Sequence, residues 1–139
     1  MARKSAYLEH LARVPLFSDC SMSELEQLAR RTTDITIEAG QAVLLEGRAG
    51  FEFFVIVAGK ASVTRRGKRI AELRPGDFFG ELALLDNAPR DATVTALTPM
   101  EVIVLTRAEF NAALAEAPRM TRKLMTGMAH RLRQLDELV

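Results

Sequence analysis

Alternation of apolar and polar positions dominates the middle of the chain. Ile35 and Ile37 alternate with Thr36 and Glu38, and a period of two predicts a half-buried β-strand. Glycine- and proline-containing turns separate the apolar runs that follow. These runs predict further strands at 43–45, 51–57, 61–64, 70–73, 78–79, 91–96 and 101–105. Many short strands joined by such turns predict a mainly β structure, either a small closed barrel or a double sheet.

Helical spacing marks both ends of the chain. Ser21 and Glu24 fit the spacing of a capping box, and Pro118 suits the first turn of a helix. Helices are therefore predicted over 5–13, from 21 to about 31, over 107–115 and from 118 to about 138. The expected organisation is one domain over 1–139, with N-terminal helices over 1–33, a β-barrel over 34–106 and C-terminal helices over 107–139.

The last predicted helix carries an apolar stripe whose steps alternate between three and four residues, as in a coiled coil. The stripe consists of Met125, Met128, Leu132, Leu135 and Val139. It covers only two to three heptads, and two interpretations remain open. The helix packs against its own barrel, or it forms the seam of a homodimer through residues 119–139.

Composition narrows the class of protein. The chain has 139 residues, of which 48% are hydrophobic, so one domain with a packed core is expected. With 19 basic and 18 acidic residues, the net charge of +1 gives no general attraction for nucleic acid or an anionic membrane. The sequence shows no membrane-spanning run and no signal peptide. The single cysteine, Cys20, allows no internal disulfide, and a cytoplasmic location is expected.

The stretch from Phe78 to Ala96 carries the clearest candidate chemistry. Gly80 permits a backbone conformation that side chains disfavour, and a short helical segment follows it. The first amides of a helix lack partners within the helix and favour a negative group such as a phosphate. Arg90 follows a turn and can bind phosphate through two parallel hydrogen bonds. Glu81 suits a sugar hydroxyl, so the stretch predicts a ligand with a phosphate close to a ribose hydroxyl.

The letters FGELALL, followed by PR and ATV, make this stretch resemble the phosphate-binding cassette of cyclic nucleotide-binding domains. The resemblance places the cassette at 78–94 and includes Gly80 in the ligand site. It implies that Arg90 binds the cyclic phosphate and that Glu81 binds the ribose 2′-hydroxyl. The implied amide donors are Leu82, Ala83, Asp91 and Ala92. The implied fold is a jelly-roll-like β-barrel with an N-terminal helical motif, a C-terminal hinge helix and a long last helix.

The resemblance also implies a pocket wall and a lid. Val63, Phe78 and Phe79 are expected to flank the sugar and base. A lid over the base is expected from the last helix, through Arg131, Gln134 or Leu135.

The predicted ligand is cAMP, with cGMP as the second choice. Asp91 stands where the family usually has Ala, Ser or Thr. Either its side chain points to solvent and only its amide is used, or its carboxylate accepts from the exocyclic amine of a syn guanine and favours cGMP.

These observations predict a regulatory sensor domain in which ligand binding moves the C-terminal helices, and not an enzyme. His10 and His130 lie outside the predicted strands, and no nucleophile or nucleotide-hydrolysis motif is evident, so neither a metal site nor a cofactor is expected.

Two alternatives remain open. In the first, the chain is the sensing half of a transcription regulator of the catabolite activator kind, because it stops at Val139 before any DNA-binding helix. Met1 then favours an N-terminal fragment or a complete small protein. Otherwise it is a ligand-free interaction module with the same fold. No binding to nucleic acid or membrane is expected from this chain alone.

Overall fold

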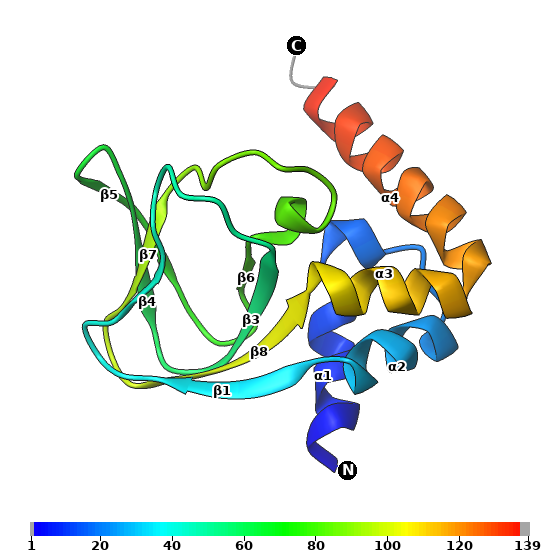
Figure 1. Cartoon of the computed structure of the whole chain (residues 1–139), viewed down its shortest axis with the longest axis horizontal. Helices are drawn as coiled ribbons and strands as arrows, with labels where there is room; N and C mark the ends of the chain where they lie inside the picture. Colours follow the sequence, from blue (N-terminus) through cyan, green and yellow to red (C-terminus); the bar gives the residue numbers. More distant parts are fainter. Residues whose placement is uncertain (1, 137–139) are drawn as a thin grey trace. The chain divides into compact units, whose positions relative to one another are not determined.

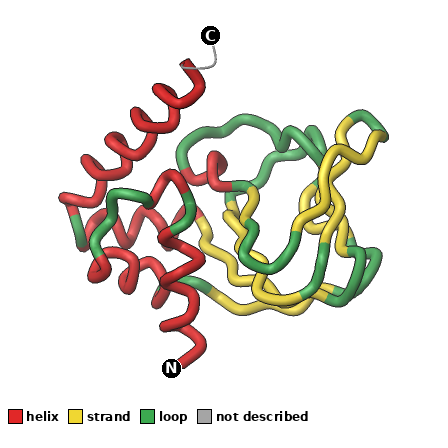
Figure 2. Tube along the Cα trace, turned by 180° about the vertical axis from the view of Figure 1, so that it is seen from behind, coloured by secondary structure: helices red, strands yellow, loops and turns green. Residues whose placement is uncertain are grey.

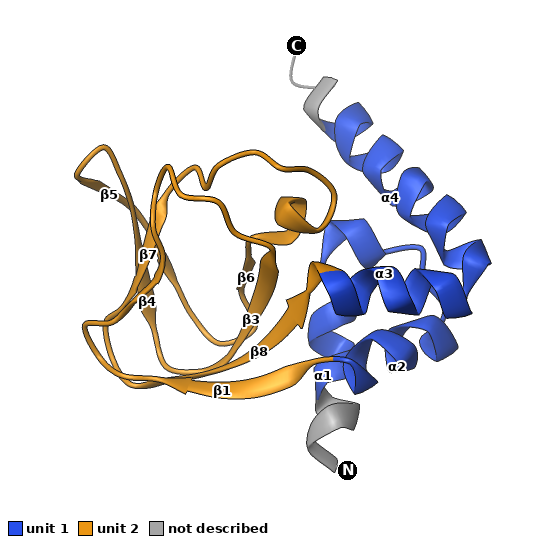
Figure 3. Ribbon diagram, in the orientation of Figure 1, with its two compact units in different colours: residues 1–31, 108–139 blue, residues 32–107 orange. Residues whose placement is uncertain are grey.

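The computed structural model describes residues 2–136 and shows two compact units (Figure 3). One unit consists of Met1–Arg31 and Ala108–Val139 and is helical, and we call it the helical unit. The other consists of Thr32–Arg107 and contains the strands, and we call it the β unit. The helical unit is therefore built from both ends of the chain, whereas the β unit is one continuous segment.

The strands of the β unit form two four-stranded antiparallel sheets within residues 2–136 (Figure 1). In chain order the strands are β1 Thr33–Ile37, β2 Ala42–Leu44, β3 Glu52–Ala58, β4 Ala61–Arg65, β5 Lys68–Leu73, β6 Phe78–Phe79, β7 Thr93–Ala96 and β8 Met100–Thr106. One sheet has the order β1-β8-β3-β6 and the other β2-β7-β4-β5. The predicted mainly β fold is confirmed, as two sheets and not as one closed barrel among the described residues.

The two sheets share one apolar core. Its buried members come from strands of both sheets, and Ile56 and Val102 are fully inaccessible to solvent. The core consists of Ile37, Phe54, Ile56, Ala61, Phe79, Val94, Ala96, Met100, Val102 and Val104. Alternate residues along β3 and β8 supply this core because side chains of a strand point to opposite faces in turn.

Two apolar side chains predicted to lie in half-buried or core strands are exposed instead. Ile35 is 38% exposed, because β1 is an edge strand that pairs only with β8. Phe51 is 48% exposed, because β3 begins one residue later, at Glu52. The backbone carbonyl of Phe51 instead accepts a hydrogen bond from the amide of Arg107, at 2.8 Å.

The helical elements agree with the predicted positions to within a few residues. The helical unit contains α1 Ala2–Ala12, the 3₁₀ turn η1 Pro15–Phe17, α2 Met22–Arg30 and α4 Pro118–Asp136, and α3 Arg107–Glu116 continues into it from β8. The predicted capping box is confirmed: the Ser21 hydroxyl accepts from the Glu24 amide at 3.2 Å, and the Ser21 amide donates to Glu24 Oε1 at 2.8 Å. Among the described residues, no helix combines the length and apolarity needed to cross a membrane.

Helix α4 packs on η1 through one of its faces. Met120 and Leu124 are buried there. Gly127 comes so close to η1 that a Cβ on it would lie 2.9 Å from the carbonyl oxygen of Pro15. Glycine in a helix lowers its stability, on the order of 1 kcal/mol relative to alanine. At position 127 it permits the close contact with η1.

The predicted apolar stripe of α4 is largely on another face. Met125 is 67% exposed, Leu132 is 58% exposed and Met128 is half-buried. The side chain of Leu135, and Val139, lie outside the described residues. The interpretation that this stripe packs within the chain is therefore not supported at Met125 and Leu132, and the homodimer seam stays a prediction.

A partly buried ion pair joins α2 to α4. Glu24 is only 7% exposed, and its Oε1 accepts from Nζ of Lys123 at 2.8 Å. Burial by itself raises the pKa of Glu24, but hydrogen bonds from Lys123 and Ser21 outweigh it, so the pKa lies below its ordinary value of 4.5.

This depressed pKa predicts loss of stability in acid. Stability from the pair is fully present above about pH 4.5 and is lost as the pH falls through the folded-state pKa, where Glu24 becomes protonated. Glu24→Gln should flatten this part of the stability–pH curve in urea unfolding followed by circular dichroism. Glu26→Gln, an exposed neighbour on the same helix, is the control. Equal acid sensitivity of wild type and Glu24→Gln would contradict the assignment.

Candidate anion-binding site

The candidate site begins where β6 ends. Gly80 follows Phe79 with φ of 83°, in the left-handed region that favours glycine. The short 3₁₀ helix η2, Glu81–Leu84, starts directly after it and is visible as the isolated helical turn among the loops in Figure 2. A Cβ on Gly80 would also lie 2.9 Å from the carbonyl oxygen of Glu52 and 3.0 Å from Nη1 of Arg90. Glycine is therefore required both for the turn and for the approach of Arg90.

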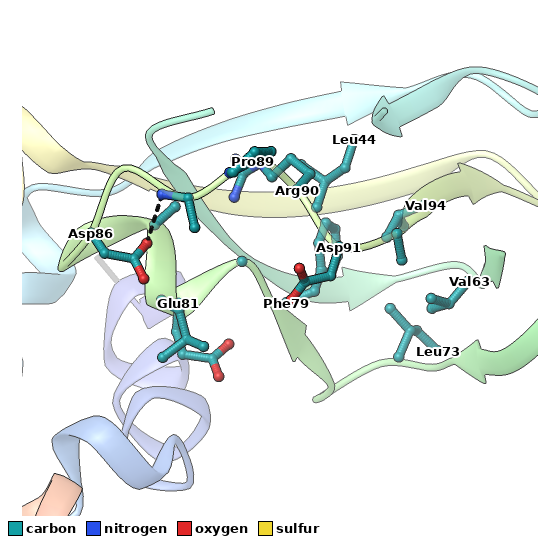
Figure 4. A pocket seen from close by; sticks show the side chains of 15 residues that line it. Leu44, Val63, Leu73, Phe79, Glu81, Asp86, Pro89, Arg90, Asp91 and Val94 are labelled. Carbon is teal, nitrogen blue, oxygen red and sulfur yellow. Dashed lines mark hydrogen bonds between the residues drawn. The ribbon is translucent and has the colours of Figure 1, made fainter. Parts of the chain in front are cut away.

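A pocket of about 320 Å³ opens beside η2 (Figure 4). Its volume lies at the lower end of the range of small-molecule sites. Charged groups come from the cassette, and Leu44, Val63, Leu73 and Val94 give an apolar wall from the sheet of β2, β7, β4 and β5. The lining residues are Leu44, Val63, Leu73, Phe79, Gly80, Glu81, Leu82, Ala83, Asp86, Ala88, Pro89, Arg90, Asp91, Ala92 and Val94.

The pocket brings together most of the residues that the sequence singles out. All seven predicted ligand residues line it, namely Gly80, Glu81, Leu82, Ala83, Arg90, Asp91 and Ala92, and so do Val63 and Phe79. Phe78 does not, because consecutive residues of a strand point to opposite faces. Its ring packs against Phe53 instead, with 6.2 Å between the ring centroids. The pocket lining therefore does not support the expectation that Phe78 flanks the ligand, and it stays a prediction.

Arg90 is the buried cation of the pocket. It is 8% exposed, and its Nη2 donates to the carbonyl oxygen of Glu52 at 2.9 Å and lies 3.4 Å from Oε1 of the same residue. Burial lowers the pKa of Arg90 below its ordinary value, and the Glu52 carboxylate opposes that shift. A guanidinium nevertheless stays protonated at ordinary pH. The pocket therefore contains a positive charge that is partly removed from water.

The backbone of Arg90 is fixed by the loop before β3. Its amide donates to the carbonyl oxygen of Arg48 at 2.9 Å, and its carbonyl accepts from the amide of Gly47 at 2.8 Å. Because both backbone groups are engaged, the side chain of Arg90 leaves the cassette from a defined position.

Backbone amides add to the positive character of the pocket. Within residues 2–136, no hydrogen bond occupies the amides of Leu82, Asp91 and Ala92. The amide of Ala83, in contrast, donates to the carbonyl oxygen of Gly80 at 3.1 Å, because the residues after Gly80 form a 3₁₀ turn. Three of the four predicted amide donors are therefore available to an anion, and that of Ala83 is already engaged.

Two carboxylates of the lining have different surroundings. Glu81 is half-buried on η2, and Asp91 is exposed at the other side of the pocket (Figure 4). The carbonyl oxygen of Asp91 accepts from Nε of Arg65 at 3.1 Å, which ties this end of the cassette to β4. An ionised carboxylate only accepts hydrogen bonds, so Glu81 can receive a hydroxyl but repels a phosphate.

Residues outside the cassette support the site, and the sequence reasoning missed them. A Cβ on Gly50 would lie 2.3 Å from Nε of Arg90, so only glycine leaves room for this guanidinium. The carbonyl oxygen of Glu52 accepts a hydrogen bond from this guanidinium. Arg107 donates a hydrogen bond to the carbonyl oxygen of Ala83 in the cassette. No local pattern reveals these contacts, because they join positions 20 to 40 residues apart. Leu44 and Leu73 were detectable only as apolar strand positions.

The predicted lid and histidines lie on other elements. Arg131 and Gln134 are exposed on α4 in the helical unit, and the side chain of Leu135 lies outside the described residues. The lid therefore stays a prediction. His10 and His130 belong to α1 and α4, and the part of the chain that the structure describes contains no cluster of His, Cys, Asp or Glu that could hold a metal ion.

Comparison with known proteins identifies the class. The family model of the cyclic nucleotide-binding domain matches residues 34–117, and this chain belongs to that family. The match covers both sheets except Thr33 at the start of β1, the cassette and all of α3.

Relatives with this domain include kinase regulatory subunits and transcription regulators. The chain is 42% identical over 114 residues to a cAMP-dependent protein kinase regulatory subunit of Yarrowia lipolytica, covering 81% of this chain but only 30% of that protein. The N-terminal domain of a transcriptional regulator from Streptomyces coelicolor has a TM-score of 0.84 at 29% identity, covering 93% of this chain and 94% of that one. The regulatory domain of a Toxoplasma gondii kinase, solved with cAMP, has a TM-score of 0.73 at 31% identity, covering 81% and 44%.

The lack of space beside Gly50 predicts that a small substitution there lowers ligand affinity, whereas the same substitution at an open glycine does not. Gly50→Ala should displace the Arg90 guanidinium and weaken cyclic nucleotide binding at least about tenfold, as loss of charge-assisted hydrogen bonds does. Gly67→Ala is the control: its φ of 78° makes alanine strained, but no atom lies within 4 Å of the added Cβ. It should cost roughly 1–2 kcal/mol of stability without changing affinity. Equal affinities of both variants in calorimetric titrations would contradict the packing assigned to Gly50.

Proposed function

We propose that this domain is a sensor that binds a cyclic nucleotide, with cAMP as the preferred ligand. The observation that carries the proposal is the convergence of Arg90, three unoccupied amides and Glu81 on one pocket. Membership of the cyclic nucleotide-binding domain family supports it, as does the likeness to a kinase regulatory domain solved with cAMP.

Different groups of the pocket would bind the phosphate, the ribose hydroxyl and the base of such a ligand. The cyclic phosphate would bind Arg90 and the amides of Leu82, Asp91 and Ala92, where charge-assisted hydrogen bonds are strongest. Glu81 would accept from the ribose 2′-hydroxyl. The sugar and base would lie along the apolar wall that includes Val63.

Regulation requires that the ligand bind one conformation better than another. In this proposal the cassette changes on binding, and α3 and α4 respond. Arg131, Gln134 or Leu135 would then cover the base. The chain spans 30% of the Yarrowia lipolytica regulatory subunit, so the output of the whole protein, whether kinase inhibition, transcription or homodimer formation through α4, is not specified by this domain.

Titration of nucleotide-free protein with cAMP tests the proposal. Wild type should bind one equivalent, and Arg90→Ala should bind at least about tenfold more weakly, because a buried charge partner of the phosphate is lost. Arg69→Ala is the matched control, since Arg69 is an exposed arginine on the β4–β5 hairpin. Circular dichroism checks that Arg90→Ala is folded. A folded wild type that binds neither cAMP nor cGMP would refute the proposal and favour a ligand-free interaction module.

A substitution of Asp91 tests whether this residue affects the preference between cAMP and cGMP. If its carboxylate only faces solvent, Asp91→Ala should leave the ratio of cAMP to cGMP affinity unchanged and raise both affinities slightly, because a negative charge near the phosphate is removed. This is the result we expect, since the side chain is exposed. A selective loss of cGMP affinity in Asp91→Ala would show instead that the carboxylate binds the guanine amine.

A further inference from the structure

Arg107 makes a dense set of hydrogen bonds to the cassette. Its Nε and Nη2 donate to the carbonyl oxygen of Ala83 at 2.9 and 2.5 Å, and Nη2 also donates to the carbonyl oxygen of Asp86. Its Nη1 donates to Oδ1 of Asn87 at 2.6 Å. One side chain therefore binds three places along the cassette: Ala83 in η2, Asp86 two residues after η2, and Asn87 in the turn toward Arg90.

One of these acceptors, the carbonyl oxygen of Ala83, is a group that η2 itself leaves unsatisfied. The last carbonyls of a helix lack partners within the helix. The amide of Asp86 donates to the carbonyl oxygen of Leu82 at 3.1 Å, so it is not available to Ala83. Ala83 is 7% exposed, and a buried carbonyl without a partner is costly. Arg107 supplies the hydrogen bonds that let η2 end at this point.

Phe51 contacts both the backbone and the guanidinium of Arg107. The amide of Arg107 donates to the carbonyl oxygen of Phe51 at 2.8 Å, and its guanidinium lies 4.7 Å from the centroid of the Phe51 ring. A cation over an aromatic face is attracted to it. This accounts for the position of a phenylalanine ring that remains 48% exposed.

Arg90 and Arg107 therefore share one short segment. Gly50 makes room for Arg90, Glu52 accepts its hydrogen bond, and Phe51 between them binds Arg107. The amide of Phe51 donates to Oε1 of Glu52 at 3.0 Å, which links the two halves of the segment. A shift of residues 50–52 would move both arginines, and with them both ends of the cassette.

We propose that Arg107 is a positioning residue for the ligand site. It fixes η2 and the cassette turn against the segment that holds Arg90, and it ties them to the first residue of α3. Binding at the cassette is thereby transmitted to the start of α3 through this side chain. The proposal rests on the proposed function for the ligand but has a test that needs no ligand.

Arginine is required because the acceptors lie around a planar fork. Lysine keeps the charge but presents a point-like ammonium, which cannot reach Ala83, Asp86 and Asn87 together. Arg107→Lys therefore removes the geometry while retaining the charge. Asn87→Ala removes one acceptor from an exposed turn and is a second variant that should fold without difficulty.

Affinity is the first readout. Arg107→Lys should weaken cAMP binding roughly tenfold, and Asn87→Ala should weaken it less. Adding Asn87→Ala to Arg107→Lys should cost less than it costs wild type, because the two residues act through one contact. Ile56→Val, which lowers stability in the core away from the pocket lining, is the control. An affinity loss in Arg107→Lys no larger than that in Ile56→Val would overturn the proposal.

Hydrogen exchange measured by mass spectrometry is the second readout. Without ligand, Arg107→Lys should speed exchange at least about tenfold over residues 81–88 and leave the core strand β3 protected. Saturating cAMP should slow exchange in wild type over both 81–88 and 107–112, but in Arg107→Lys only over 81–88. Unchanged exchange over 81–88 without ligand, or a ligand response over 107–112 equal to that of wild type, would overturn the proposal. Failure of wild type to bind cAMP would refute the proposed function alone, because the ligand-free comparison still tests Arg107.

Discussion

The site depends on a guanidinium that is buried before any ligand arrives. Arg90 is 8% exposed, and the carbonyl oxygen of Glu52 accepts one of its hydrogen bonds at 2.9 Å. Desolvation of a charge is costly, and this carbonyl, together with the partly exposed Glu52 carboxylate 3.4 Å away, compensates only part of that cost. The remaining donors of the guanidinium therefore favour an anion from the pocket. Gly50 and Gly80 exist in this sequence at the two positions where any side chain would collide with this group.

The rest of the β unit holds this arrangement in place. The antiparallel pairing of β3 with β8 brings the start of β3, which carries Glu52, beside Thr106 at the end of β8. Arg107 follows directly, so the sheet register itself determines that Phe51 and Arg107 meet. The sheet of β2, β7, β4 and β5 contributes the apolar wall opposite the charged cassette. The polar side of the pocket thus comes from the segment between β6 and β7, and the apolar side from one of two sheets that share one core.

How far the sequence predicted this structure depends on the range of each interaction. The capping box of Ser21 and Glu24 and the cassette from Gly80 to Arg90 are local, so their spacing was readable. The mainly β fold followed from alternation along the strands. Contacts of Gly50 and Arg107 with the cassette depend on the sheet register, which residue spacing does not specify. Exposure of Ile35 depends on β1 being an edge strand, and engagement of the Ala83 amide depends on η2 being a 3₁₀ turn.

The discontinuous helical unit has a consequence for biosynthesis. Residues 32–107 are contiguous, and domains generally fold as units while the chain is synthesised. The β unit is therefore complete once Arg107 has left the ribosome. Helices α1 and α2 emerge earlier, but Phe110, whose ring lies beside that of Phe17, and Lys123, which pairs with Glu24, emerge only after the strands. The N-terminal helices thus remain without their full packing throughout synthesis of the strands, and the helical unit is completed only after the β unit has been synthesised.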